Sequence, residues 1–174
     1  MADRLVLVGM MGSGKSTVGR ELAGRLGWAF LDSDAQVEAS TGSTVAELFA
    51  ERGEEGFRAE ESRVLAEALA GGQPAVVSAA GGTVLAEANR ALLRSGGIVV
   101  WLRAEPATLA ARVGSGAGRP LLGGDPAARL VELDAVRRPL YEEVADVTVD
   151  VDRLDRSGVV DRILALTAFE RSRP

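Results

Sequence analysis

Short apolar runs alternate along the chain with longer stretches in which apolar residues recur every three or four positions. The short runs are almost continuously apolar, as expected for strands of a parallel sheet that is covered on both faces. We expect such strands at residues 5–8, 29–31, 75–78, 98–102 and 147–151.

The longer stretches predict helices between these strands. Pro106 and Pro126 suit the first turn of a helix, where the missing N–H leaves no helical hydrogen bond unmade. Strands that alternate with helices predict a three-layer α/β fold with right-handed crossover connections. The helices are expected at residues 16–26, 44–51, 56–70, 86–94, 106–113, 126–144 and 157–169.

Two segments interrupt this alternation within what we expect to be a single domain, residues 1–174. Residues 33–56 contain two short helices and no strand, which predicts a small added substructure. Residues 114–125 are rich in glycine and carry one arginine, Arg119. This composition suits a surface loop. If the chain binds a nucleotide, the composition instead favours a lid that closes over the nucleotide and brings Arg119 to it.

Composition narrows the possible chemistry. The net charge of −5 and the lack of a basic block disfavour nucleic acid as a partner. No apolar run is long enough to span a membrane, no signal-peptide pattern is present, and there is no cysteine, so we expect a cytoplasmic protein without membrane attachment. The sequence also lacks histidine, so acid–base chemistry must fall to carboxylates, Lys15 or the lone tyrosine, Tyr141.

The strongest motif lies directly after the first expected strand. Residues 9–16 have the spacing G-x-x-x-x-G-K-S of a phosphate-binding loop, and Lys15 is the only lysine of the chain. In such a loop, backbone N–H groups surround an anion and the following helix adds the positive end of its dipole. A chance match in a glycine-rich turn is disfavoured by so many constrained positions. We therefore predict nucleoside triphosphate binding by Gly12, Ser13, Gly14, Lys15, Ser16 and Thr17.

The metal and the phosphate acceptor need carboxylates, but the expected strand at 75–78 ends in glycines. Asp32 and Asp34 follow the strand at 29–31, and ligands of open parallel sheets bind at the carboxyl ends of strands. Helix capping would explain one of the two acids. We predict that Asp32 and the Ser16 hydroxyl hold Mg²⁺, and that Asp34 orients a substrate hydroxyl and could accept its proton.

Three further features indicate a small hydroxylated carboxylic acid as the acceptor. Arg58 lies near the start of an expected helix, Gly81 and Gly82 lie at a strand end, and Arg137 lies in a later helix. Each has an ordinary explanation: a surface ion pair, a turn or a solvated charge. Together with Asp34 they would supply two guanidiniums, backbone donors and a hydroxyl acceptor, and arginine binds a carboxylate through two parallel hydrogen bonds.

The order of these motifs resembles the shikimate kinase family, small P-loop kinases of aromatic amino-acid biosynthesis. The phosphate-binding loop is shared by many kinases, whereas the combination of the remaining motifs is specific, and together they span residues 5 to about 150. The matching segments are residues 9–17, Asp32-Ser33-Asp34, Phe57-Arg58 with Glu61, Gly81-Gly82, residues 119–122 and residues 137–141.

The resemblance implies a five-stranded parallel sheet in the order 2-3-1-4-5. It also implies transfer of phosphate from ATP to the 3-hydroxyl of shikimate, giving shikimate 3-phosphate and ADP, by a monomer that uses one Mg²⁺. Residues 33–61 correspond to the family's shikimate-binding region and residues 114–125 to its lid. Lys15, Asp34 and Arg119 would be catalytic, and Glu61 would brace Arg58. The implied shikimate contacts are Asp34, Arg58, Gly81, Gly82 and Arg137.

Two positions depart from the family pattern. Ala80 stands where the family usually has the first of three consecutive glycines, so Ala80 is left out of the predicted contacts. Near the C-terminus the family often places a proline against the adenine, opposite an arginine. Arg112 can be that arginine, but the matching region offers Ser157 and no proline.

Other functions fit parts of the same pattern. A gluconate kinase would also bind ATP and a hydroxylated acid, although the segments around Arg58 and Arg137 favour shikimate. A nucleoside or nucleoside monophosphate kinase would need an aromatic base-stacking site beyond Phe49 and Phe57. A catalytically silent nucleotide-binding protein would keep the loop, and Ala80 is the feature that favours this alternative.

Overall fold

A computed structural model of the chain describes residues 4–114 and 120–170. Its centre is a five-stranded sheet in the order β2-β3-β1-β4-β5, and every neighbouring pair of strands is parallel. The α/β fold and the strand order are therefore confirmed. The strands are β1 (Arg4–Val8), β2 (Ala29–Asp32), β3 (Ala75–Ser78), β4 (Ile98–Arg103) and β5 (Val147–Asp150).

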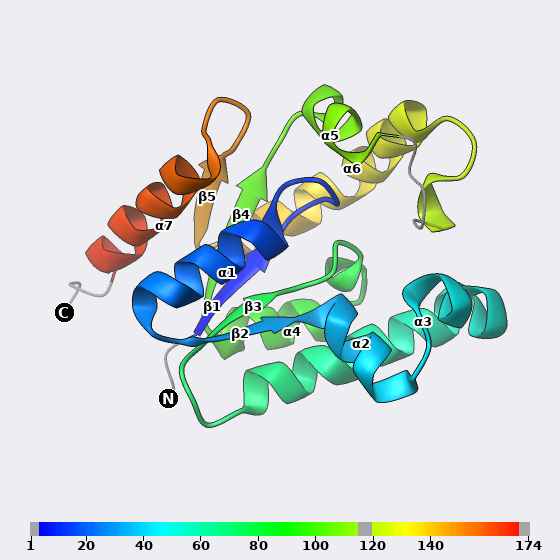
Figure 1. The fold of residues 1–174 in the computed structure, drawn as a ribbon, viewed down its shortest axis with the longest axis horizontal. Helices are drawn as coiled ribbons and strands as arrows, with labels where there is room; N and C mark the ends of the chain where they lie inside the picture. Colours follow the sequence, from blue (N-terminus) through cyan, green and yellow to red (C-terminus); the bar gives the residue numbers. More distant parts are fainter. Residues whose placement is uncertain (1–3, 115–119, 171–174) are drawn as a thin grey trace.

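Helices cover both faces of the sheet and complete the three layers (Figure 1). Helices α1 and α7 lie together on one face, and α3, α4 and α6 lie on the other. Within the described residues, no helix has both the length and the apolar character needed to cross a membrane. The helices are α1 (Lys15–Leu26), α2 (Ser33–Thr41), α3 (Val45–Ala70), α4 (Glu87–Gly96), α5 (Pro106–Val113), α6 (Pro126–Val144) and α7 (Arg156–Glu170).

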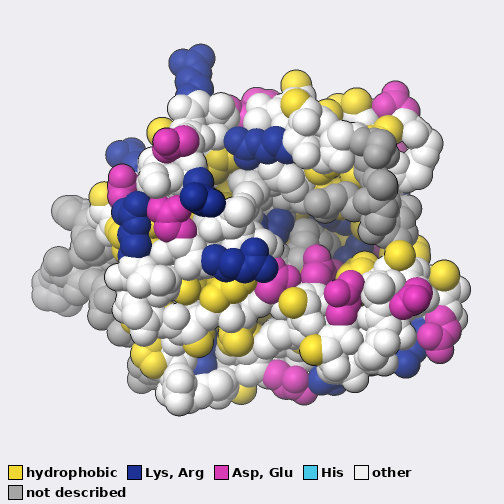
Figure 2. Space-filling model, in the orientation of Figure 1, with side chains coloured by type: hydrophobic (Ala, Val, Ile, Leu, Met, Phe, Trp, Pro, Cys, Tyr) yellow, Lys and Arg dark blue, Asp and Glu magenta, His cyan; other side chains and the backbone are white. Residues whose placement is uncertain are grey.

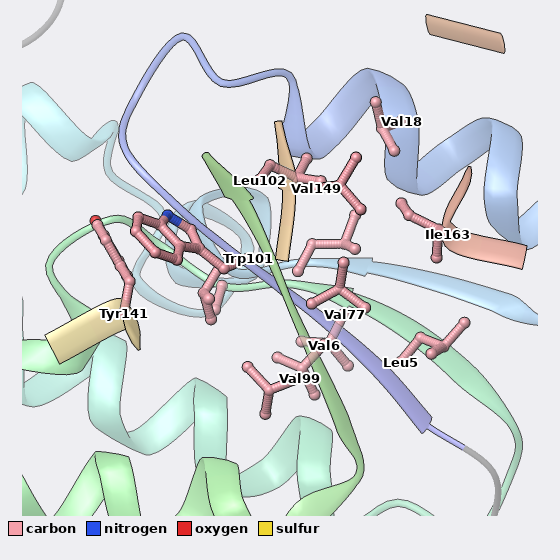
Figure 3. Packing of buried hydrophobic residues seen from close by; sticks show 14 of the residues in the cluster. Leu5, Val6, Val18, Val77, Val99, Trp101, Leu102, Tyr141, Val149 and Ile163 are labelled. Carbon is pink, nitrogen blue, oxygen red and sulfur yellow. The ribbon is translucent and has the colours of Figure 1, made fainter. Parts of the chain in front are cut away.

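The core lies on both sides of the three central strands, which explains their continuous apolar runs. Val6 is the register neighbour of Val77 on β3 and of Val99 on β4, and all three are fully buried. Further along β4, Trp101 faces Tyr141 of α6, with ring centroids 5.9 Å apart (Figure 3). This packing fixes the rotation of α6 against the sheet.

One sequence expectation about this region is confirmed, and another lies outside the described residues. Element α3 consists of two helices that meet at Gly53, where φ is 68° and ψ is −175°, in agreement with the helices expected at 44–51 and 56–70. Glycine permits this left-handed φ without a Cβ clash, so the chain can leave the first helix there and begin the second. Of the glycine-rich segment 114–125, residues 115–119 lie outside the described residues, and with them Arg119.

Candidate active site

The phosphate-binding loop connects β1 to α1 and passes close to β4. Gly9 has a φ of 146°, and a Cβ at this position would lie 2.7 Å from the Leu102 carbonyl oxygen, so only glycine fits. Lys15 begins α1, and its Nζ donates hydrogen bonds to the carbonyl oxygens of Gly9 (2.7 Å) and Met10 (2.9 Å). The ammonium group is thereby held over the loop, next to the N-terminus of α1, where an anion is favoured.

Asp32 serves two purposes at the end of β2. Its Oδ1 accepts a hydrogen bond from the Ala35 N–H at 3.2 Å and caps α2. Its Oδ2 accepts a hydrogen bond from the Ser16 hydroxyl at 2.5 Å. The capping interpretation and the metal-site interpretation of Asp32 are therefore compatible, because each uses a different carboxylate oxygen. Asp34 lies in the first turn of α2.

One cavity of about 480 Å³ brings these groups together. Because the sheet runs from β2 at one edge to β5 at the other, Asp34 lies near one end of the cavity and Val151, after β5, lies near the other. Figure 2 shows this face of the molecule hollowed between the part that holds α1 and the part that holds α2 and α3. The predicted residues that line the cavity are Gly12, Ser13, Gly14, Lys15, Ser16, Thr17, Asp32, Asp34, Gly81 and Arg112.

Arg58 and Glu61 form an ion pair on α3, beside Gly81 and Gly82. These two glycines follow β3 and are called the glycine loop below. Arg58 Nη1 lies 2.5 Å from Glu61 Oε2, and Glu61 is only 2% exposed. Burial raises the pKa of Glu61 above its ordinary value, while the charge of Arg58 acts in the opposite direction. A Cβ on Gly82 would collide with the Arg58 guanidinium, so a glycine at this position leaves room for the guanidinium where it lies.

Arg137 is buried on α6 and lies against the other glycine of the loop. Its exposed fraction is 2%, and its Nη1 would be 3.2 Å from a Cβ on Gly81. Among the described residues, neither the Arg137 Nε nor the buried Arg58 Nε has a hydrogen-bond acceptor. Buried cations with unused donors are stabilised when an anion supplies the missing acceptors. The two guanidiniums, both beside the Gly81–Gly82 loop, thus suit a carboxylate.

The neighbouring arginine, Arg138, has a different role. Its Nε donates to Asp134 Oδ2 at 2.9 Å and its Nη2 donates to the Ala104 carbonyl oxygen at 3.3 Å, at the end of β4. Its guanidinium also lies 5.8 Å from the centre of the Trp101 ring. Arg138 therefore fastens α6 to the sheet, and only Arg137 of the pair lies at the glycine loop.

Tyr141 is not available for acid–base chemistry. Its side chain is completely buried, and burial raises the pKa of the phenol far above its ordinary value. Of the acid–base candidates named from composition, the carboxylates and Lys15 line the cavity, whereas Tyr141 does not.

The end of the cavity near β5 contains two residues that the sequence did not single out, Leu154 and Arg156. They follow the carboxyl end of β5, and this position was the signal that could have found them. Arg112 lies in the same region and donates hydrogen bonds to the carbonyl oxygens of Gly12 (3.2 Å) and Val151 (3.4 Å). Ser157 instead donates its hydroxyl hydrogen to Glu21 of α1 at 3.1 Å.

A parallel sheet of this strand order, with a phosphate-binding loop after β1 and acids after β2, defines a P-loop kinase. The family model for shikimate kinase matches residues 11–168. The chain belongs to the shikimate kinase family.

Individual relatives agree with this assignment. A shikimate kinase of Symbiobacterium thermophilum is 52% identical over 163 residues, which covers 92% of this chain and 93% of the relative. One from Thiobacillus denitrificans is 47% identical, covering 90% and 86%. Among solved structures, the shikimate kinase of Acinetobacter baumannii in complex with shikimate matches with a TM-score of 0.94 and 37% identity over 99% of this chain and 97% of that one.

Proposed function

We propose that this protein transfers the γ-phosphoryl group of ATP to the 3-hydroxyl of shikimate, giving shikimate 3-phosphate and ADP in aromatic amino-acid biosynthesis. The observation that carries this proposal is the position of Arg58 and Arg137, two cations beside the Gly81–Gly82 loop with donors that suit a carboxylate. The family membership and the A. baumannii structure with bound shikimate support the same substrate.

The order of the strands suggests how the two substrates share the cavity. The loop after β1 lies in the middle, so it would hold the triphosphate, with the γ-phosphate toward Asp34 and the base toward Arg112. Gly12, Ser13, Gly14, Ser16 and Thr17 would bind phosphate oxygens through the loop and the helix N-terminus.

The acceptor would bind on the β2–β3 side of the cavity. Arg58, Arg137 and the Gly81–Gly82 loop would hold its carboxylate and ring, so that Asp34 orients the 3-hydroxyl toward the γ-phosphate and accepts its proton. Lys15 would neutralise charge on the transferring phosphoryl group, and we assign the same role to Arg119. Phosphoryl transfer depends mainly on positioning and charge stabilisation, so a site without histidine is sufficient.

The reaction class implies one Mg²⁺, and the residues at the loop fit it. Ser16 and Asp32 present a hydroxyl and a carboxylate 2.5 Å apart, and Mg²⁺ prefers oxygen ligands, usually one or two carboxylates with phosphate oxygens. No group of three acidic, histidine or cysteine side chains suited to a metal occurs in the part of the chain described, in keeping with a metal that shares phosphate ligands. Bound there, Mg²⁺ would offset the charge of the β- and γ-phosphates.

Residues 33–61 would form the shikimate-binding part of a single domain, residues 1–174. A small cluster of buried side chains supports this division, because it joins α2 to α3 apart from the main core: Val37, Leu48, Phe57 and Val64. We also propose that residues 114–125 close as a lid, and that the protein works as a cytoplasmic monomer without nucleic acid or membrane partners.

A steady-state assay that couples ADP release to a colour change tests the proposal. With ATP and Mg²⁺, we expect turnover with shikimate and, at the same concentration, at least about 100-fold less with gluconate, because the flexible open chain of gluconate does not hold a hydroxyl at a fixed distance from its carboxylate. Equal rates with gluconate would favour a gluconate kinase. ATP binding without turnover of any acid would favour the catalytically silent alternative.

A further inference from the structure

The Tyr141 hydroxyl lies close to two parts of the predicted carboxylate site, the Arg137 guanidinium and the Gly81–Gly82 loop. It is one helical turn after Arg137 on α6, and its ring packs against Trp101 of β4 (Figure 3). The whole side chain is buried, so the ring has little freedom to turn.

This hydroxyl donates a hydrogen bond to the Gly81 carbonyl oxygen at 2.6 Å. The Arg137 guanidinium lies beside the same glycine, because a Cβ on Gly81 would be 3.2 Å from Arg137 Nη1 and 3.5 Å from the Tyr141 hydroxyl. A phenol that donates one hydrogen bond keeps its acceptor positions, which face a neighbouring guanidinium favourably. The peptide group is planar, and holding the Gly81 carbonyl therefore also sets the direction of the Gly82 N–H.

We propose that Tyr141 is a positioning residue for the substrate carboxylate. Its neutral hydroxyl holds the Arg137 guanidinium and the Gly81–Gly82 peptide in one arrangement before the acid binds. Without it, Arg137 would have to be ordered during binding, which weakens affinity without touching the nucleotide site. This inference rests on the proposed function, because it names how that same site recognises its acid.

The Tyr141→Phe variant removes only the hydroxyl. We expect its KM for shikimate to rise about tenfold or more, as for loss of a hydrogen bond to a charged group. The KM for ATP, and kcat at saturating shikimate, should stay within about twofold of wild type, because phosphate-loop contacts are unchanged. In the Arg137→Ala background the same substitution should add little, because the two residues act through one contact.

Calorimetric titration with shikimate and with its methyl ester distinguishes a positioning role of the Tyr141 hydroxyl from a general loss of structure in the variant. The Tyr141→Phe variant should lose affinity for the acid and much less for the ester, which has no carboxylate to hold. Thr167→Val is the matched control, because it removes another buried hydroxyl, which donates to the Ile163 carbonyl oxygen at 2.9 Å on α7. The control should alter thermal stability and leave both affinities unchanged.

Three outcomes would overturn the inference: an unchanged shikimate KM in Tyr141→Phe, equal losses for the acid and the ester, or full additivity with Arg137→Ala. If Tyr141→Phe does not fold, 3-fluorotyrosine is incorporated at Tyr141, the only tyrosine of the chain, which changes the acidity of the hydroxyl without removing it. This protein should then show a changed affinity for the acid with unchanged affinities for the ester and for ATP, and an unchanged affinity for the acid would overturn the inference. Failure of wild type to phosphorylate shikimate would instead refute the proposed function.

Discussion

Glycine and arginine define the acceptor site at the scale of single residues. Gly82 leaves room for the Arg58 guanidinium, and Gly81 leaves room for that of Arg137. A methyl group at Gly82 would displace Arg58 from its place beside Glu61. Ala80, the residue before these glycines, lines the cavity together with Gly81.

Glu61 is the buried acid of this site, and its titration can be measured. Burial raises its pKa above the ordinary value of 4.5, so the native state holds a proton more tightly than the unfolded chain. The free energy of unfolding therefore falls as pH rises from about 4.5 through the pKa of the native state. We expect urea unfolding of wild type to show this decline between pH 4.5 and 8 relative to Glu61→Gln. A difference between the two proteins that is constant with pH would contradict the raised pKa.

Motif and strand position were enough to predict Lys15, Ser16, Asp32 and Asp34 as neighbours. A phosphate-binding loop has fixed spacing, and the carboxyl ends of parallel strands meet at one edge of a sheet. The position of Tyr141 could not be predicted in this way. It depends on how α6 rotates against β4, which is decided by long-range packing on Trp101 and has no local sequence signal.

At the scale of elements, α4 connects the two walls of the acceptor site. Asn89 Nδ2 donates to the Ser62 hydroxyl oxygen at 2.9 Å and to the Thr83 carbonyl oxygen at 3.1 Å. Ser62 in turn donates to the Arg58 carbonyl oxygen at 3.0 Å. A single amide on α4 thus joins α3, which holds Arg58, to the segment that follows Gly82.

Replacing this amide should weaken both the fold and the site. Asn89 is 4% exposed, so Asn89→Leu leaves buried polar groups without a partner and should reduce the free energy of unfolding by about 1–3 kcal/mol. The KM for shikimate should rise while that for ATP changes little. Ser95→Ala is the control on the same helix, because Ser95 donates only to carbonyl oxygens of α4 itself. Urea unfolding that finds Asn89→Leu as stable as the control would refute this connecting role.

Helix prediction succeeded in α3, but only for the positions of the helices. Helices were expected at 44–51 and 56–70, and the backbone leaves the helical conformation at Gly53 between them. Buried residues on either side of this break, such as Leu48 and Val64, meet in one cluster. This packing sets the direction of the second helix relative to the first, and hydrophobic periodicity does not contain that information.

At the scale of the whole molecule, the sheet explains why distant segments form one site. Strands β2, β3 and β1 are neighbours, so Asp34, Gly81 and Lys15 lie at adjacent strand ends. The apolar runs predicted which segments are strands. They did not predict the strand order, which came from the family resemblance, because a buried parallel strand has little in its sequence that selects its partner.

The most direct test of the account is the identity of the phosphorylated hydroxyl, followed by ³¹P–¹H NMR in a reaction of the protein with ATP, Mg²⁺ and shikimate. We predict phosphorus coupled to the ring proton at carbon 3. We also predict that Asp34→Asn binds ATP normally while its rate falls about 100-fold or more, since the hydroxyl is no longer oriented or deprotonated. Phosphorus on another hydroxyl, or wild-type turnover by Asp34→Asn, would contradict the arrangement of triphosphate, carboxylate and acceptor described above.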